Sequence, residues 1–419
     1  MTFSTAISGI NAANSDLGVI SNNIANASTT GFKASRAEFA DVYATSLLGA
    51  GDNAIGRGVS LASVTQEFAQ GNITFTNNSL DLAINGAGYF ITSVEGATQY
   101  TRAGGFQVDR EGFLVTNQNS RLQGFQVDSL GEITGQLGDI QIDRSLVSPN
   151  PTSQVTLTTN LDSRETIPGP AFGGPFNAPV NSTAPDPLSF NATTSTTIFD
   201  SLGNPHVLSL FFVKNASNTY DVFSLIDGIT VDGGTPFTLA FNDAGELTTD
   251  PADLVVSGWD PVDADGVDNG AATQNVTVNL TSTTQFGADF AISSVIQDGF
   301  SAGQLRGLEI DETGIAFARY TNGESQALGQ VALASFNNEN GLQPIGDTAW
   351  VETFSSGSPN VGEPGTSGLG AIQSAALEDS NVEITQALVD LIIAQRNFQA
   401  NAQVIQSNDA ITQTVINIR

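Results

Sequence analysis

The stretch FSTAISGINAANSDLGVISNNIANA, from Phe3 to Ala27, decides how this chain is organised. Its apolar residues recur at alternating spacings of about three and four, as in the seam of a coiled coil. These residues are Phe3, Ala6, Ile10, Ala13, Leu17, Ile20, Ile24 and Ala27. Such a stripe is stable only when another element covers it. The sequence therefore predicts an N-terminal helix that needs a partner.

The C-terminal end of the chain repeats the same spacing. The apolar residues there are Ile384, Leu388, Leu391, Phe398, Ala402 and Ile405. Gln395 interrupts the stripe, and its register drifts beyond Asp409. We expect residues 1–30 and 373–419 to form one coiled-coil-like inner element of an assembling subunit. Its predicted helix-packing residues are Ile10, Leu17, Ile20, Ile24, Leu388, Leu391, Phe398 and Ile405.

The composition excludes several classes of function. With 13 Lys and Arg against 43 Asp and Glu, the formal net charge is −30, so duplex nucleic acid and anionic membrane surfaces are unsuitable partners. The absence of cysteine rules out disulfides and thiolate metal sites. No basic segment precedes an apolar run near the start, and no apolar run approaches the roughly 20 residues of a membrane span. We expect no cleaved signal peptide, no membrane insertion and no cofactor.

The rest of the chain predicts mainly β structure. Turn-forming residues follow the first helix and end it at Gly31, which is free to adopt a positive φ. We expect residues 31–75 to be a loosely structured connector. Residues 76–145 with 286–372 are predicted to form a first β-rich outer domain, and residues 146–285 a second one inserted into it. The expected fold class is therefore nested, discontinuous β domains combined with terminal helices.

A short turn unit recurs through both β regions. An Asp or Asn is followed three positions later by Gly, with apolar residues on either side. The unit occurs at Asp109 to Gly112, Asp128 to Gly131, Asp200 to Gly203, Asn242 to Gly245 and Asp311 to Gly314. These positions suit a type I turn closed by a left-handed glycine, a common hairpin connection. Hairpins are therefore expected at each of them.

The segment from Asn22 to Lys33 carries a polar signature. Its residues are Asn22, Asn23, Ala25, Asn26, Thr29, Gly31, Phe32 and Lys33. Together with Leu80 to Ile84, Tyr100 to Gly104 and Leu377 to Glu383, it resembles the bacterial flagellar rod and hook axial proteins. Rod members of that family are much shorter and lack a large central β insert, so the chain is similar to the hook members.

This resemblance implies a structural subunit and no enzyme. Hook members are expected to polymerise into a flexible curved tube that couples the rod to the filament and transmits torque. The implied partners are the chain itself, distal rod and hook-filament junction proteins, and the hook cap and flagellar export apparatus during assembly. The implied location is the hook and basal body outside the cell, reached without a cleaved signal peptide. We expect Lys33 to make a solvated or cross-subunit contact.

Three other protein classes stay open at this point. A β-rich surface adhesin or tail-fibre protein would share the acidity and the hairpins, but it would not need matched terminal helices. A hook-filament junction protein would share the N-terminal signature, but a more helical inner domain would be expected of it. A glycosidase carboxylate pair also stays open, because a sequence does not show which carboxylates face each other.

The remaining candidate sites are weak. His206 is the only histidine, which excludes a multi-His metal site within one chain, and we expect it at a hairpin surface. Asp263, Asp265 and Asp268 lie around a glycine, but the EF-hand spacing and its closing Glu are missing. An acidic loop without a bound cation is the expected structure there.

Overall fold

A computed structural model describes residues 2–42, 56–128, 131–174, 176, 184–263 and 266–417. The chain divides into two compact units. Unit 1 comprises residues 1–143, 307–319 and 325–419, and unit 2 comprises residues 144–306 and 320–324. The second unit is therefore inserted into the first, as the nested fold class predicted. The finer division into helical element, connector and two outer domains stays a prediction.

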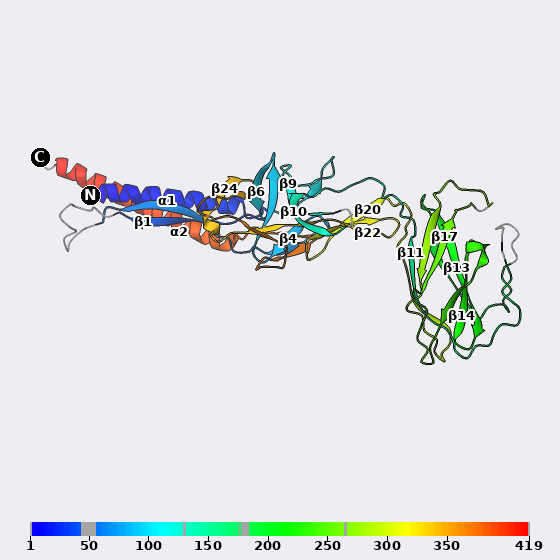
Figure 1. Ribbon diagram of the computed structural model, residues 1–419. Coiled ribbons are helices and arrows are strands. Elements are labelled where there is room, and N and C mark those ends of the chain that lie inside the picture. Colours follow the sequence, from blue (N-terminus) through cyan, green and yellow to red (C-terminus); the bar gives the residue numbers. More distant parts are fainter. Residues whose placement is uncertain are drawn as a thin grey trace. The chain divides into compact units, whose positions relative to one another are not determined.

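Two helices from opposite ends of the chain pack together in unit 1. They are α1 (Thr2–Ala25) and α2 (Ile384–Asn417), and they lie side by side (Figure 1). A Cβ added at Gly9 would lie 2.6 Å from Oδ1 of Asn401, and the charges of Asp16 and Asp390 interact. Because the lower number in α1 meets the higher number in α2, the helices run antiparallel. The predicted pairing of the chain ends is confirmed.

The β structure of unit 1 is built from many short strands. They are β1 (Ser35–Asp41), β2 (Val59–Gln66), β3 (Ile73–Phe75), β4 (Leu82–Asn85), β5 (Tyr89–Val94), β6 (Ala97–Thr101), β7 (Gln107–Val108), β8 (Leu114–Val115), β9 (Arg121–Val127), β10 (Ile133–Asp139), β20 (Leu305–Ile310), β21 (Ile315–Tyr320), β22 (Ser325–Val331), β23 (Leu333–Ser335), β24 (Gln343–Gly346), β25 (Ala349–Val351), β26 (Asn360–Gly362), β27 (Ala371–Ser374) and β28 (Ala376–Glu378). The largest sheet runs in the order β20-β21-β22-β9-β5-β6-β25-β24. One face of this sheet covers an aromatic cluster that includes Tyr89, Tyr100 and Trp350.

The two flanks of the chain pair with each other inside unit 1. β3 pairs with β28 and β4 pairs with β27, both antiparallel. The segment predicted to be loosely structured also forms strands, because β1 and β2 make an antiparallel ladder with Ser35 opposite Gln66 and Asp41 opposite Val59. The expectation of loose structure was therefore wrong for these strands. Alternation is weak in them because most of their residues are exposed, which is why the pattern did not stand out.

Unit 2 is a pair of β-sheets around one core. Its strands are β11 (Gln154–Asn160), β12 (Ala192–Phe199), β13 (Pro205–Ala216), β14 (Thr219–Ile226), β15 (Ile229–Thr230), β16 (Phe237–Ala240), β17 (Asp253–Trp259), β18 (Gln274–Asn279) and β19 (Ala291–Gln297). One sheet has the order β17-β18-β11-β19 and the other β12-β13-β14-β15, with β16 beside β14. Buried residues at every second position, such as Leu208, Leu210 and Phe212 of β13, fill the space between the sheets.

The recurrent turns have the predicted geometry. In each of them the glycine N–H donates to the carbonyl oxygen of the Asp or Asn three positions earlier. Each of these glycines has a left-handed φ, between 81° and 91°. Asp263 to Gly266 forms another turn of this kind, since Gly266 N–H donates to the carbonyl of Asp263.

Candidate functional site

The seam between α1 and α2 is formed by small residues. Among the residues of the two helices whose burial is described, the buried apolar ones are Ala6 and Ala13 of α1 and Ala394 of α2. Gly9 lies so close to Asn401 that a Cβ there would need the amide to move. Small residues let helix backbones approach closely, and they leave little apolar area in the seam. Where their burial is described, the larger aliphatic side chains of the two helices are half-buried or exposed.

The predicted helix-packing residues are mostly half-buried. Seven of them are half-buried, namely Ile10, Leu17, Ile20, Ile24, Leu391, Phe398 and Ile405. Leu388 is 46 % exposed. Their role in packing between subunits stays a prediction, because a single chain contains no partner to test it.

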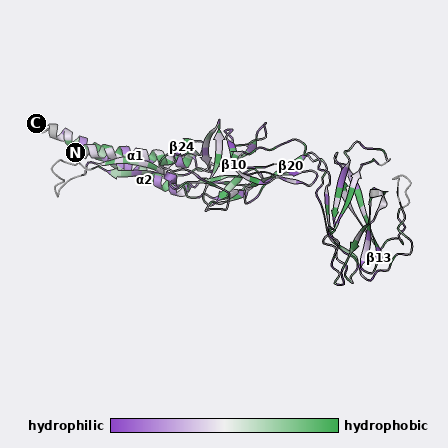
Figure 2. Ribbon diagram, in the orientation of Figure 1, coloured by the Kyte–Doolittle hydropathy of each residue, from purple (hydrophilic) through white to green (hydrophobic). Residues whose placement is uncertain are grey.

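α2 carries a second apolar stripe that the sequence analysis did not single out. Val389, Ile393, Val404 and Ile411 are all at least 46 % exposed. At about 100° per residue, these positions lie on a flank of the helix, roughly 80–140° around its axis from Ala394. Their separations of 4, 11 and 7 residues place them on one line along the helix. Figure 2 shows apolar and polar residues interspersed along both helices.

Ile384, Leu388 and Ile392 add further exposed apolar area to the first half of α2. A helix that is apolar on more than one side is normally buried on more than one side. Within the described residues, α1 covers only one side of α2. No described helix is both long enough and apolar enough to cross a membrane.

The signature after α1 forms a hydrogen-bonded turn. The Asn26 amide donates to the Asn22 carbonyl at 3.0 Å and to its side-chain oxygen at 2.6 Å, and the Thr29 hydroxyl donates to Asn26 at 3.2 Å. Asn23 bonds both backbone groups of Ser35, donating at 2.7 Å and accepting at 2.9 Å. These bonds replace the helix's own hydrogen bonds where it ends. Ala25 is exposed and Phe32 is half-buried beside this turn.

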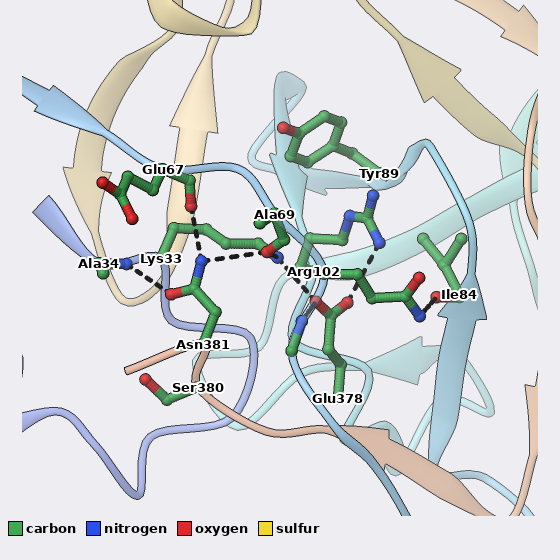
Figure 3. Close-up of polar contacts among 12 residues, drawn as sticks. Lys33, Ala34, Glu67, Ala69, Ile84, Tyr89, Arg102, Glu378, Ser380 and Asn381 are labelled. Atoms are coloured by element: carbon green, nitrogen blue, oxygen red, sulfur yellow. Dashed lines mark hydrogen bonds and ion pairs between the residues drawn. The ribbon is translucent and has the colours of Figure 1, made fainter. Parts of the chain in front are cut away.

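Lys33 lies at the centre of a buried ionic cluster (Figure 3). Its Nζ donates to Oε1 of Glu378 at 2.7 Å and to the carbonyl of Ala69 at 2.8 Å. The side chain of Lys33 is 1 % exposed and that of Glu378 is 0 % exposed. Burial lowers the pKa of Lys33 from its ordinary value, and the Glu378 carboxylate opposes that shift. The expected solvated or cross-subunit contact of Lys33 is therefore wrong.

Arg102 completes the cluster from the other side. It donates to Oε2 of Glu378 at 3.1 Å and to the carbonyl of Gly86 at 2.9 Å, and its guanidinium lies over the ring of Tyr89. The N–H of Gly71 donates to Oε1 of Glu378 at 2.9 Å. One carboxylate thus holds two cations and a backbone donor from distant parts of the chain. Tyr89 has a raised pKa because it is buried and lies near Glu339.

Asn381 ties the same segments together beside this cluster. Its side-chain oxygen accepts from Ala34 N–H at 2.7 Å, and its amide donates to the carbonyls of Glu67 and Ala69. Gly31 N–H donates to the backbone carbonyl of Glu378 at 2.8 Å. The signature after α1 and the segment before α2 therefore form one joint at the base of the helix pair. We call Lys33, Arg102, Glu378 and Asn381 the polar joint.

The other polar candidates are structural. His206 is 5 % exposed, with Nδ1 2.6 Å from Asp227 and Nε2 3.4 Å from Asp200, so its expected surface position is wrong. Asp263 and Asp268 accept backbone N–H bonds from Val267 and Gly270, while Asp265 lies outside the described residues. No cluster of three or more metal-ligating side chains occurs in the part of the chain that the structure describes.

Four family profiles match successive parts of the chain. They are the flagellar basal body rod protein profile at residues 3–33, the flagellar hook protein FlgE/F/G D1 domain at 83–159, the flagellar basal body protein FlaE D2 domain at 160–300 and the flagellar basal body rod FlgEFG C-terminal profile at 373–418. The chain is 36 % identical to flagellar hook protein FlgE of Escherichia coli over 432 residues, covering 100 % of both chains. The chain belongs to the flagellar hook protein family. The hook protein FlgE of Salmonella typhimurium is 34 % identical over 428 residues, again covering 100 % of both chains.

A solved hook protein has a similar fold. The crystal structure of Helicobacter pylori flagellar hook protein FlgE2 matches with a TM-score of 0.56 at 15 % identity, covering 73 % of this chain and 100 % of the other. This likeness concerns the fold alone. The family membership agrees with the fold derived above, in which β units are inserted between two terminal helices that pack together. As a flagellar hook protein the chain is a structural subunit.

Proposed function

We propose that this chain polymerises with copies of itself into the curved, flexible tube of the flagellar hook, which couples the rod to the filament as a universal joint and transmits torque. The observation that carries the proposal is the exposed stripe Val389, Ile393, Val404 and Ile411 on α2. A monomer gains nothing by holding four aliphatic side chains in water along one helix. Contact with helices of neighbouring subunits would bury these side chains, and the packed helices would line the tube.

The partners and the location follow from family membership as further proposals. The chain would contact the distal rod and the hook-filament junction proteins at the two ends of the hook. During assembly it would pass through the flagellar export apparatus without a cleaved signal peptide and be added beneath the hook cap outside the cell. Binding to nucleic acid requires basic side chains that contact the phosphates, and the acidic composition of this chain does not favour such contacts. We propose no catalysis and no cofactor for it.

Substitutions on α2 test the polymerisation. We expect Ile393→Glu to abolish hooks, because a carboxylate in a helix–helix contact would be buried without a partner. The matched control is Gln403→Glu, which adds the same charge to the same helix at an exposed polar position. Each variant would replace the native chain in cells, followed by electron microscopy of hooks and a motility assay. Secreted monomer would be measured to show that export persists.

The stripe is assigned to subunit contacts only if the two variants differ. Hooks of normal number and length from Ile393→Glu would refute the proposal. Loss of hooks with Gln403→Glu as well would show that added charge anywhere on α2 prevents assembly, and the stripe would then have no special role.

A further inference from the structure

Arg396 is an exposed cation of α2 that lacks a counter-charge in its own helix pair. α1 contains no Lys or Arg, and the guanidinium of Arg396 forms no ion pair with any of the described residues. On a helix, side chains pair at spacings of three and four residues. At these spacings Arg396 meets only Ile392, Ile393, Gln399 and Ala400. No carboxylate of α2 is therefore spaced to pair with it.

Arg396 lies on the side of α2 that faces away from α1. Ala394 is buried in the seam, and at about 100° per residue Arg396 is turned roughly 160° from it around the helix axis. The exposed residues Val389 and Ile393 are turned about 140° and 100° in the same direction. Arg396 therefore borders the exposed apolar stripe of α2. A neighbouring subunit that covers the stripe also meets this guanidinium.

A guanidinium beside a covered apolar stripe needs a carboxylate. The neighbour would remove water from around Arg396, and an unpaired charge is costly to remove from water. Arg can bind a carboxylate through two parallel N–H bonds, which makes the pair strong and specific in its geometry. We therefore expect the neighbour to present acidic side chains at this point.

The helix pair presents two carboxylates close together. Asp16 of α1 and Asp390 of α2 are both half-buried and form no ion pair with the described residues. Each lies on the seam side of its helix, about 60° from Ala13 and about 40° from Ala394 respectively. Burial raises the pKa of Asp16, and the charge of Asp390 raises it further. A cation from outside the chain would stabilise both carboxylates in their charged form.

Arg396 does not reach these two carboxylates within its own chain. It is six residues from Asp390, which separates them by about 9 Å along the helix and about 120° around it. The cation and the acidic pair are thus separate surfaces of one subunit, as a head-to-tail contact between copies requires. Glu383, just before α2, and Asp409 are single carboxylates, so each attracts a cation less strongly than Asp16 and Asp390 together.

We propose that Arg396 of one subunit pairs with Asp16 and Asp390 of a second copy of the chain. The inference rests on the proposed polymerisation and names one contact within it. The apolar stripe supplies the contact area, and the ion pair selects which face of the neighbouring helix pair covers the stripe. Every subunit gives one guanidinium and receives another.

Cysteine crosslinking tests the contact, because the natural chain contains no cysteine. A chain with Arg396→Cys and an epitope-tagged chain with Asp16→Cys would be co-expressed with the native chain, so that hooks assemble from the mixture. Isolated hooks would be treated with a short bismaleimide. A product that joins tagged and untagged chains can only come from two subunits. The matched control replaces Asp16→Cys by Asn14→Cys, an exposed residue of α1 that is turned about 160° from Asp16.

We expect the mixed dimer from hooks that carry Arg396→Cys with Asp16→Cys. Much less of it should form with Asn14→Cys, or when the hooks are first dispersed into monomers. Hooks that contain both variants but give no mixed dimer would overturn the inference. Equal crosslinking with Asn14→Cys would overturn it as well.

Neutral variants test whether charge is what joins the two surfaces. Arg396→Gln should lower the temperature at which hooks dissociate, while the thermal unfolding of the monomer should hardly change, because Arg396 is exposed there. In a chain with Asp16→Asn and Asp390→Asn, the same substitution should cause no further decrease. An equal decrease in both backgrounds would show that Arg396 has a different partner, and the inference would fail. The proposed polymerisation fails separately, if cells that lack the chain still form hooks.

Discussion

The polar joint offers the sharpest test of how unit 1 is held together. Glu378→Gln removes the shared negative charge with almost no change in side-chain volume. The carboxylate of Glu378 accepts from Lys33 at 2.7 Å, from Gly71 N–H at 2.9 Å and from Arg102 at 3.1 Å. The variant leaves Lys33 and Arg102 buried at 1 % and 3 % exposure without their common counter-charge.

The size of the effect follows from this geometry. Removing one partner of a buried ion pair costs about 3–5 kcal/mol, because the remaining charge stays buried and unpaired. Lys33→Met should cost less, about 1–3 kcal/mol, because Glu378 keeps Arg102 and loses one charged hydrogen bond. The double variant should be more stable than the sum of the two losses predicts, since it removes the stranded cation of Lys33 as well.

The two tryptophans make the assay specific for one unit. Trp350 belongs to unit 1 and Trp259 to unit 2. In a Trp259→Phe background, the fluorescence of Trp350 during urea unfolding reports the stability of unit 1 alone. The matched control is Glu309→Gln, which breaks the exposed ion pair with Arg319 in the same unit. An exposed pair contributes below about 1 kcal/mol.

The reasoning would be refuted by a loss of stability that is small, or that is no larger than the loss in the control variant. If Glu378→Gln destabilises unit 1 no more than Glu309→Gln does, then the cluster is not an energetic joint. The same conclusion follows if the losses in Lys33→Met and Glu378→Gln simply add, because shared interactions must show coupling.

Two further predictions concern the backbone of the signature and the histidine of unit 2. Gly31 has φ 68°, and a Cβ there would lie 2.5 Å from the backbone nitrogen of Ala103, whereas Gly357 has φ 77° and open space around it. Gly31→Ala should therefore destabilise unit 1 by clearly more than the roughly 1–2 kcal/mol of left-handed strain expected for Gly357→Ala, and equal losses in urea unfolding would contradict the close contact. Burial by itself lowers the pKa of His206, but Asp227 and Asp200 outweigh it and raise the pKa above 6.5. The folded chain then holds the proton more tightly than the unfolded chain, so this stabilisation is complete below about pH 6.5 and is lost as pH rises through the folded pKa. Unfolding followed by Trp259 in a Trp350→Phe background should show that decline, and His206→Asn should remove it.

Local chemistry explains what the sequence predicted well. The Asp/Asn-x-x-Gly turns were predictable because the glycine and its hydrogen-bond acceptor are three residues apart. Gly31 takes the left-handed conformation that was expected of a glycine among the turn-forming residues after the first helix. The pairing of the two terminal helices was predictable because each has an apolar stripe that needs cover. Each of these signals is contained in one short window of residues.

Contacts between distant residues explain what the sequence did not predict. Lys33 and Glu378 are separated by 345 residues, so the sequence near Lys33 does not indicate that this side chain pairs with a buried carboxylate. His206 follows a proline in a hairpin, which favours exposure, yet Asp227 from the next turn covers it. Residue 285 was the expected end of the inserted β domain, yet β19 lies beyond it and belongs to unit 2. The reason is that β19 pairs with β11, a contact between strands that are far apart in the sequence.

The small residues of the helix seam link the fold to assembly. Among the described residues of the helix pair, the buried apolar ones are small, namely Ala6, Ala13 and Ala394, so at about 25 cal/mol per Å² each of them contributes little. The larger apolar residues beside them, such as Leu17 and Phe398, are only half-buried in a single chain. Further apolar area of α2 is on Val389, Ile393, Val404 and Ile411, which are exposed in a single chain. Part of the stabilisation available to α2 therefore depends on neighbours, while the polar joint connects the segments at one end of the helix pair within the subunit. We expect a neighbour that covers this stripe to stabilise α2 further by mass action, so the helix pair should be more stable in the polymer than in a single chain.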